Sequence, residues 1–351
     1  MEANDYTNLF LKWLGGSCFA CSDVFSFRHE ASRIEFWLQH ILGSPRTEKM
    51  RVRISPAELH LVVKIGQAQE VRRLLAAGGD PDAIYRGITL LGTAISSQDK
   101  AMVQVLLSAG ADASVPSHGS NGRLEPPLYT ACRLKDDELA EMLIRAGADL
   151  NASDFYGHTP LWVATKGQRP LLVAKLLAAG SRLGSTEDYS WSQCPLYLAT
   201  KYLGYRGRHQ LAMFLMAAGA DPTRMDSKGR SAIYWSLRNR DHDLFVFMID
   251  SYNPRCWDSM LQRRVEELLT ELPDTHLKIL QKQWYNPPSL AKQCRLVIRL
   301  HLLQKFNYRS LFLLVPRLPL PVAIQRFLLL DQELPDEETT PCFMKDISIK
   351  T

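Results

Sequence analysis

The chain has 351 residues, of which 46% are hydrophobic and 23% are charged, and its formal net charge is +5. This ordinary globular composition suggests about two domains, and no run of Lys and Arg is dense enough to indicate nucleic-acid binding. Seven cysteines, an odd number scattered through a long chain, indicate a reducing compartment. The pair Cys18 and Cys21 lacks the further ligands of a zinc site, so we expect no metal and no cofactor.

The N-terminal segment, residues 1–50, does not have the pattern of a signal peptide, because acidic residues and a lysine interrupt its apolar stretch. Residues 31–42 predict a helix within it. The most apolar window, 311–330, is long enough for a membrane span but contains two arginines and three prolines. Charges and helix breakers are costly in a bilayer, so we expect no membrane segment. We expect the protein in the cytoplasm, and the nucleus stays open as a further location.

A two-helix pattern recurs between residues 51 and 250. A first helix with a Leu-x-x-Ala core is followed by a second helix that ends in Leu-Leu-x-x-Gly-x-Asp. A degenerate sixth copy spans 226–250, with Ile233 in place of the core leucine. The core leucines recur at intervals of 32, 37, 33 and 35 residues, and they are Leu59, Leu91, Leu128, Leu161 and Leu196.

This period and the stretch DFYGHTPLWVAT (154–165) resemble the ankyrin repeat. The resemblance implies an all-α solenoid, in which stacked copies bury the apolar faces that one copy cannot bury alone. We expect the glycine to end each second helix in a left-handed conformation, and a Thr or Ser before Pro to cap the first helix. The N-terminal segment should cover the first copy, and the degenerate sixth copy should close the other end.

Ankyrin arrays bind partners, and we expect this array to hold a target protein. Two stretches exceed the repeat, 112–127 and 201–210, the second of which places four extra residues between its helices. Solvated loops are the alternative interpretation. His60 stands at the Leu-His position of the repeat, and we interpret it as structural. The candidate target-binding residues are of types favoured at interaction hot spots, and they are Tyr202, Tyr205, Arg206 and Arg208.

After Asp250 the repeat stops, and residues 251–286 predict a helical linker with helices at 257–272 and 275–286. Ser289 then marks the start of another helix. On it, Leu290, Cys294 and Ile298 follow at intervals of four and therefore share one face.

Further on, Leu318, Pro319, Leu320 and Pro321 form an alternating Leu-Pro pair, which predicts an extended turn with few free backbone donors.

Residues 287–330 resemble a SOCS box. Leu290, Cys294 and Ile298 match its BC box, Leu-x-x-x-Cys-x-x-x-aliphatic, and the segment 318–321 matches its cullin-5 box, Leu-Pro-hydrophobic-Pro. The resemblance implies a small three-helix domain whose BC-box helix docks into elongin C, which pairs with elongin B. The Leu-Pro-Leu-Pro element would select cullin-5 with its RING protein. The remaining tail, 331–351, is acidic and polar, and we expect it to be disordered.

Together these resemblances predict the non-catalytic substrate receptor of a ubiquitin ligase. No nucleotide-binding, hydrolase, zinc-protease or kinase motif suggests an enzyme, and Cys294 lacks the base that a nucleophile needs. The alternative is an ankyrin scaffold without ubiquitin transfer. A structural alternative also stands, in which Leu290, Cys294 and Ile298 pack against the last ankyrin helices of the same chain.

Overall fold

The structure is a computed structural model that describes residues 54–119, 122–183, 194–203, 210–226, 228–252, 259–269 and 289–330, together with Lys278. Several expectations fall outside these residues. They are the N-terminal cap at 1–50, the second linker helix at 275–286, the tail at 331–351, and three candidate target-binding residues, Tyr205, Arg206 and Arg208.

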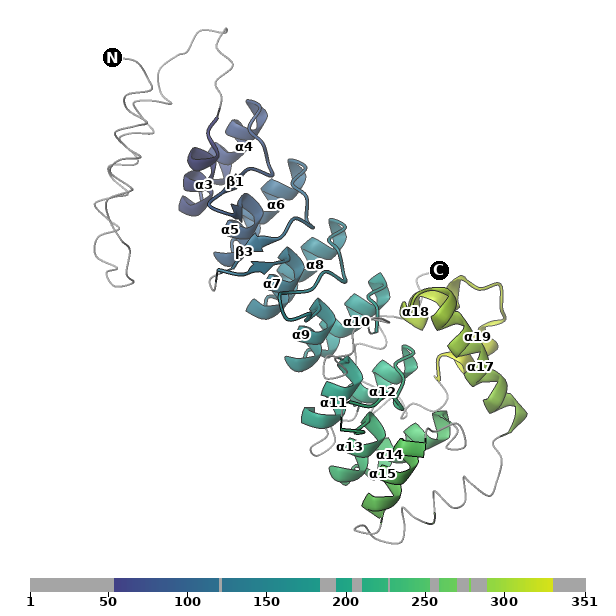
Figure 1. Cartoon of the computed structure of the whole chain (residues 1–351). Helices are drawn as coiled ribbons and strands as arrows, with labels where there is room; N and C mark the ends of the chain where they lie inside the picture. The colour runs from purple at the N-terminus through teal and green to yellow at the C-terminus, as the bar shows by residue number, and fades with distance from the viewer. Residues whose placement is uncertain are drawn as a thin grey trace, which may run out of the picture. The chain divides into compact units, whose positions relative to one another are not determined.

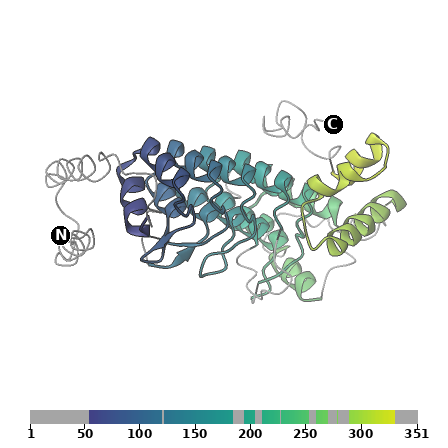
Figure 2. The same cartoon turned by 90° about the horizontal axis from the view of Figure 1, so that it is seen from above.

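Six helix pairs follow one another in the described part of residues 54–252, and they form two rows (Figures 1 and 2). The predicted all-α fold is confirmed, because beyond these and later helices the described residues hold only short strand pairs. The pairs are α3 (Pro56–Ile65) with α4 (Ala68–Ala76), α5 (Leu90–Ser96) with α6 (Lys100–Ser108), α7 (Pro127–Leu134) with α8 (Asp137–Arg145), α9 (Pro160–Lys166) with α10 (Pro170–Ala179), α11 (Pro195–Leu203) with α12 (Gln210–Ala217), and α13 (Ala232–Arg238) with α14 (His242–Ser251).

Short fingers connect one pair to the next. In the first finger, β1 (Ile84–Tyr85) pairs antiparallel with β2 (Ile88–Thr89). In the second, β3 (Ser117–His118) pairs antiparallel with β4 (Leu124–Glu125), and this finger carries the long insertion at 112–127. The insertion therefore lengthens a finger and leaves the helices on either side intact.

The turn inside each pair repeats with the period of the sequence. Its left-handed residue lies seven positions after the core Leu or Ile in five copies. In the fifth copy, α11 continues to Leu203, where the four extra residues begin. Equal placement of a left-handed backbone conformation shows that these copies share one local geometry. The left-handed turn residues are Gly66, Gln98, Lys135, Gln168 and Arg240.

The predicted caps are present. Ser55 and Thr159 each precede a proline, and the hydroxyl of each accepts a hydrogen bond from the backbone N–H three residues later. Glu58 completes a capping box with Ser55. These bonds satisfy donors that a helix start leaves unpaired.

His60 has the structural role that we expected. Its Nδ1 lies 3.2 Å from the Thr93 hydroxyl, and its Nε2 lies 3.1 Å from the Ala83 carbonyl oxygen. Burial lowers the pKa of His60 below its ordinary value. The imidazole thus ties the first helix pair to the next finger in its neutral form.

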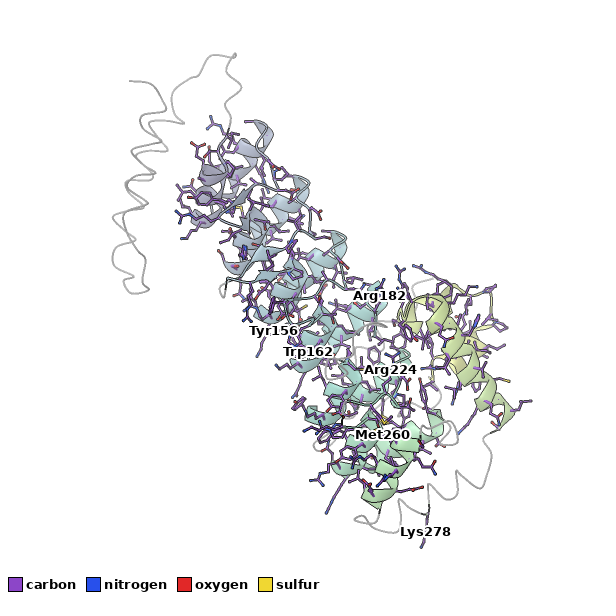
Figure 3. All side chains as sticks on the ribbon, in the orientation of Figure 1. Tyr156, Trp162, Arg182, Arg224, Met260 and Lys278 are labelled. Carbon is purple, nitrogen blue, oxygen red and sulfur yellow. The ribbon has the colours of Figure 1, made fainter. Side chains whose placement is uncertain are left out.

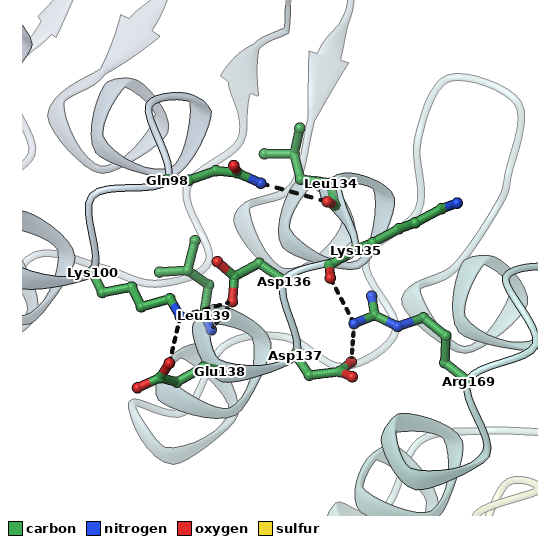
Figure 4. A network of polar contacts seen from close by, with 9 residues as sticks. All are labelled: Gln98, Lys100, Leu134, Lys135, Asp136, Asp137, Glu138, Leu139 and Arg169. Atoms are coloured by element: carbon green, nitrogen blue, oxygen red, sulfur yellow. Dashed lines mark hydrogen bonds and ion pairs between the residues drawn. The ribbon is translucent and has the colours of Figure 1, made fainter.

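Polar contacts between the turns join neighbouring copies (Figure 4). Lys100 forms ion pairs with Asp136 and Glu138 of the next copy, while the Asp136 carboxylate also caps α8. Arg169 reaches back, and its guanidinium donates to the Lys135 carbonyl at 2.7 Å and pairs with Asp137 at 2.5 Å. Exposed ion pairs add little energy, but here they fix the register between copies whose apolar faces already hold them together.

The array does not end at its sixth copy. Helix α15 (Ser259–Leu269) packs against α13, and its Leu261 and Val265 are fully buried. The expectation that the degenerate copy closes the array is therefore wrong. The apolar face of α13 needs a further cover, which this amphipathic helix provides.

The C-terminal domain contains α17 (Leu290–Lys305), α18 (Leu311–Leu314) with the 3-10 turn η3 (Val315–Arg317), and α19 (Val322–Leu328). It shares one continuous hydrophobic core with the array, and it contacts α10 and α12 (Figure 1). The Leu311 N–H donates to the Ala218 carbonyl at 2.8 Å, and the Leu183 N–H donates to the Tyr308 carbonyl at 3.1 Å. The domain is thus attached at the fourth and fifth helix pairs.

The glycine after α12 serves this attachment. Gly219 has φ +112°, and a Cβ there would lie 2.8 Å from Leu303 Cδ2 and 3.1 Å from Leu311 Cγ. Gly110 holds the same place after α6 with φ +92°, but a Cβ there would meet nothing within 4 Å. Both glycines have the left-handed backbone that the repeat requires, but only Gly219 also packs closely against the C-terminal domain.

We therefore expect Gly110→Ala to lower the free energy of unfolding by about 1–2 kcal/mol, the cost of a left-handed alanine. Gly219→Ala should cost about 1–3 kcal/mol more, because two buried leucines must move. Chemical denaturation of both variants measures the difference. Equal losses would mean that the leucines repack freely.

Candidate functional site

Helix α17 has two opposite faces. Ser289 caps it as predicted, because its hydroxyl accepts the Lys292 N–H. On the outer face, Leu290 is 76% exposed, Val297 is 66% exposed and Ile298 is 43% exposed, and the Cys294 thiol is also exposed. Apolar side chains at these positions gain nothing from the fold and remain available to a partner.

The inner face of α17 anchors it. Arg299 is 2% exposed, and its guanidinium donates to the carbonyl oxygens of Met216, Ala217 and Leu328. These carbonyls lie at the C-terminal ends of α12 and α19, where helix dipoles concentrate negative partial charge. Buried Arg295 lies over the Phe327 ring at 4.8 Å. The inner arginines therefore fix which face of α17 points outward.

The Leu-Pro-Leu-Pro segment alternates between the core and solvent. Leu318 and Leu320 are partly buried and pack against the core, whereas Pro319 and Pro321 are exposed. The Gln325 side chain donates to the carbonyl oxygens of Leu318 at 3.3 Å and Leu320 at 3.0 Å. This amide holds the extended turn, and the rigid proline rings are its accessible part.

Helix α19 also carries exposed apolar side chains. On α19, Val322 is 61% exposed and Ile324 is 44% exposed. The structural alternative, in which the Leu290 face packs against the chain's own array, does not describe this structure. The docking roles of Leu290, Cys294 and Ile298, and of the segment 318–321, remain predictions.

Two cysteines of the array have thiols with raised pKa values. Burial raises the pKa of the Cys132 thiol to about 12 and also raises that of Cys194, which keeps both thiols protonated at neutral pH. No group of three His, Cys, Asp or Glu side chains in the described ranges could hold a metal ion. In the same ranges, no helix has the length and apolar character needed to span a membrane.

Among the candidate target-binding residues, the structure describes Tyr202, which is 62% exposed beside Lys201.

The structure also shows an exposed aromatic surface that was not predicted from the sequence motifs. The Arg123 guanidinium lies over the exposed rings of Phe155 and Tyr156, at 5.2 and 4.7 Å from their centroids. The signal was available, because Phe155 and Tyr156 stand next to each other in the stretch DFYGHTPLWVAT, before the first helix of the fourth copy.

Comparison with known families identifies both modules. The family model of the SOCS box matches residues 286–329, which include α17, α18 and α19. The ankyrin-repeat model matches residues 125–155, which include α7 and α8. The other helix pairs repeat the arrangement of this matched copy.

The relatives found by sequence are ankyrin-repeat proteins. Rabankyrin-5 of Mus musculus is 27% identical over 169 residues, which are 46% of this chain and 14% of that protein. The nuclear factor NF-kappa-B p105 subunit of Gallus gallus is 31% identical over 175 residues, which are 49% of this chain and 17% of that protein. This chain thus spans less than a fifth of these two relatives.

A shorter relative is the putative ankyrin repeat protein YahD of Escherichia coli, 29% identical over 52% of this chain and 90% of its own length. Among solved structures, an ankyrin repeat domain from Acinetobacter baumannii matches with a TM-score of 0.48 and 22% identity. That match covers 54% of this chain and 95% of the other.

Proposed function

We propose that this chain, a SOCS-box adaptor with protein-binding ankyrin repeats, is the substrate-recognition subunit of a cullin-5 ubiquitin ligase. Its ankyrin array holds a target protein, and its SOCS box binds elongin C with elongin B. Cullin-5 and its RING protein then bring the charged conjugating enzyme to the target for ubiquitination and proteasomal degradation. The chain supplies binding surfaces and no catalytic group, and it acts in the cytoplasm, with the nucleus as a further location.

The exposed outer face of α17 is the observation that carries this proposal. Leu290, Cys294 and Ile298 form an apolar row on a helix whose opposite face is anchored by buried arginines. Such a row suits helix-in-groove recognition, in which a partner's apolar groove covers the side chains. The exposed prolines of the segment 318–321 support cullin selection, because they form a rigid surface separate from this row.

The cullin assignment is tested with the purified complex of this chain and elongins B and C. We expect cullin-5 to bind this complex and cullin-2 to compete poorly. Exchanging Pro319 and Pro321 for alanine should weaken cullin-5 binding about tenfold or more, because the turn loses its rigidity. Elongin binding should not change, since α17 is untouched.

Titration calorimetry with each cullin measures both steps. A control exchanges Pro170 for alanine, at the start of α10 and outside the SOCS box. Equal affinity of the wild-type complex for both cullins would contradict the assignment to cullin-5. A wild-type chain that does not bind elongins at all would instead favour the scaffold function.

A further inference from the structure

The first helices of the array carry a row of positive charge. Five residues after the core Leu or Ile, four successive copies have a basic residue. We call these residues the basic row, and they are Arg133, Lys166, Lys201 and Arg238. Lys166 and Arg238 are exposed, and the Arg133 side chain is 37% exposed. Equivalent positions in stacked copies lie side by side, so the row follows the array.

Aromatic rings lie beneath the row. Each copy has an aromatic residue one turn before its basic residue, which puts the two on one face of the helix. The Lys166 ammonium lies 4.7 Å from the Trp162 ring centroid, and the Lys201 ammonium lies 5.4 Å from that of Tyr197 and 4.7 Å from that of Tyr202. Tyr156 and Trp162 lie close together on the same side of the array (Figure 3).

Acidic side chains near the row are already used inside the protein. The Tyr129 hydroxyl donates to Asp154 at 2.8 Å, and the Tyr197 hydroxyl donates to Asp226 at 2.9 Å. Burial alone would raise the pKa of Asp154, but hydrogen bonds from the His158 backbone and from Tyr129 outweigh it and hold that pKa below its ordinary value. Asp154 and Asp226 are mostly buried, and the buried Glu125 carboxylate pairs with Arg133 at 2.9 Å. The exposed basic side chains of the strip are therefore those of Lys166 and Arg238, and Lys201 is partly exposed.

We propose that the basic row binds an extended acidic peptide segment of the target, with carboxylates at about every third residue. Helices that pack side by side lie about 8–10 Å apart, which sets the spacing of the row. Three residues of an extended chain in the polyproline II conformation span about 9 Å and complete one turn, so every third side chain points the same way. A Glu or Asp at every third position therefore meets Lys166, Lys201 and Arg238 in turn, and at the end of the row it competes with Glu125 for Arg133. The aromatic rings contact the peptide residues in between.

The same spacing disfavours a nucleic acid strand. Each strand of a duplex carries a phosphate about every 3.4 Å of helix axis, which is far denser than one cation per helix pair. The rings of Trp162 and Tyr197 also carry lysines on a face that stacked bases would need. Charge and geometry together thus favour a peptide.

Fluorescence anisotropy of full-length protein tests this inference. The probe is a labelled peptide of about 12 residues with Glu at every third position and Ser or Tyr between, long enough to span the row. The double variant Lys166→Gln with Lys201→Gln should weaken binding about tenfold, the loss of two modest ion pairs. The matched control, Arg72→Gln with Arg145→Gln, removes the same charge from exposed positions on α4 and α8 and should leave the affinity unchanged.

Two further probes test the spacing and the class of partner. A peptide of the same composition with all its Glu residues contiguous should bind more weakly. Equal affinity of the two peptides, or equal losses in both double variants, would overturn the proposal, and so would tighter binding of a single-stranded oligouridine.

The inference rests on the proposed function only in assigning target binding to the array. Anisotropy is therefore measured both with and without elongins B and C. If the protein binds the peptide but not the elongins, only the ligase assignment is contradicted. If it binds the elongins but not the peptide, only the role of the basic row is contradicted.

Discussion

The exchange of Leu290 for alanine should abolish stable copurification of elongins B and C and leave the fold intact. Covering a leucine side chain in a partner's groove contributes about 1.5–3 kcal/mol, so its loss weakens binding from about tenfold to more than a hundredfold. The side chain is 76% exposed in the free chain, so its removal should change the free energy of unfolding by less than about 0.5 kcal/mol.

Coexpression with elongins B and C, followed by calorimetry of the purified chain with the elongin pair, measures this effect. Leu171→Ala is the matched control, because Leu171 is also a helical leucine, 50% exposed on α10, and lies outside the SOCS box. If both variants bind elongins as the wild type does, the outer face of α17 is not the docking surface. Loss of thermal stability in Leu290→Ala would point to a packing role instead.

Arg299→Ala should have the opposite profile, with a large loss of stability and no direct effect on the docking face. Its removal leaves the carbonyl oxygens of Met216, Ala217 and Leu328 without this donor inside the core. Hydrogen bonds from a charged group contribute about 1.5–3 kcal/mol, and an unpaired buried polar group costs about 1–3 kcal/mol. We therefore expect the free energy of unfolding to fall by about 3–5 kcal/mol.

Denaturant titration with fluorescence detection measures this loss, and Arg317→Ala, at an exposed position in the same domain, should change stability by less than about 0.5 kcal/mol. Arg299→Lys should recover only part of the loss, since an ammonium lacks the planar fork that reaches several carbonyls at once. A full recovery by lysine would mean that charge alone matters. An unchanged stability of Arg299→Ala would remove the anchor that we assign to this residue.

Leu290→Ala tests the outer face of α17, and Arg299→Ala tests how the inner face of the same helix is attached to the array. The C-terminal domain is bound to the fifth helix pair through Arg299, Leu303 and Leu311, and next to the fourth pair through Tyr308 and Leu313. The outer face of α17 therefore has a defined direction relative to the array. In the proposed ligase, this attachment sets where the elongins and the cullin lie with respect to a bound target.

The sequence by itself determined the repeat and its register, and it placed Leu290, Cys294 and Ile298 on one face of a helix. Stacked copies impose the same demands on each unit, so core leucines, caps and left-handed turns recur at intervals that a reader can count. Spacing also sufficed for Leu290, Cys294 and Ile298, because residues four apart on a helix share a face whatever surrounds it.

Only the tertiary structure decided where the C-terminal domain is attached, which helix covers the sixth copy, and that Arg299 is buried. Arg299 and its carbonyl partner at Ala217 are 82 residues apart in the chain, and an arginine within a helix is ordinarily expected to be exposed. Every residue has a backbone carbonyl, so the sequence does not indicate which carbonyls will need a side-chain donor. That need arises only where the fold buries a carbonyl away from water.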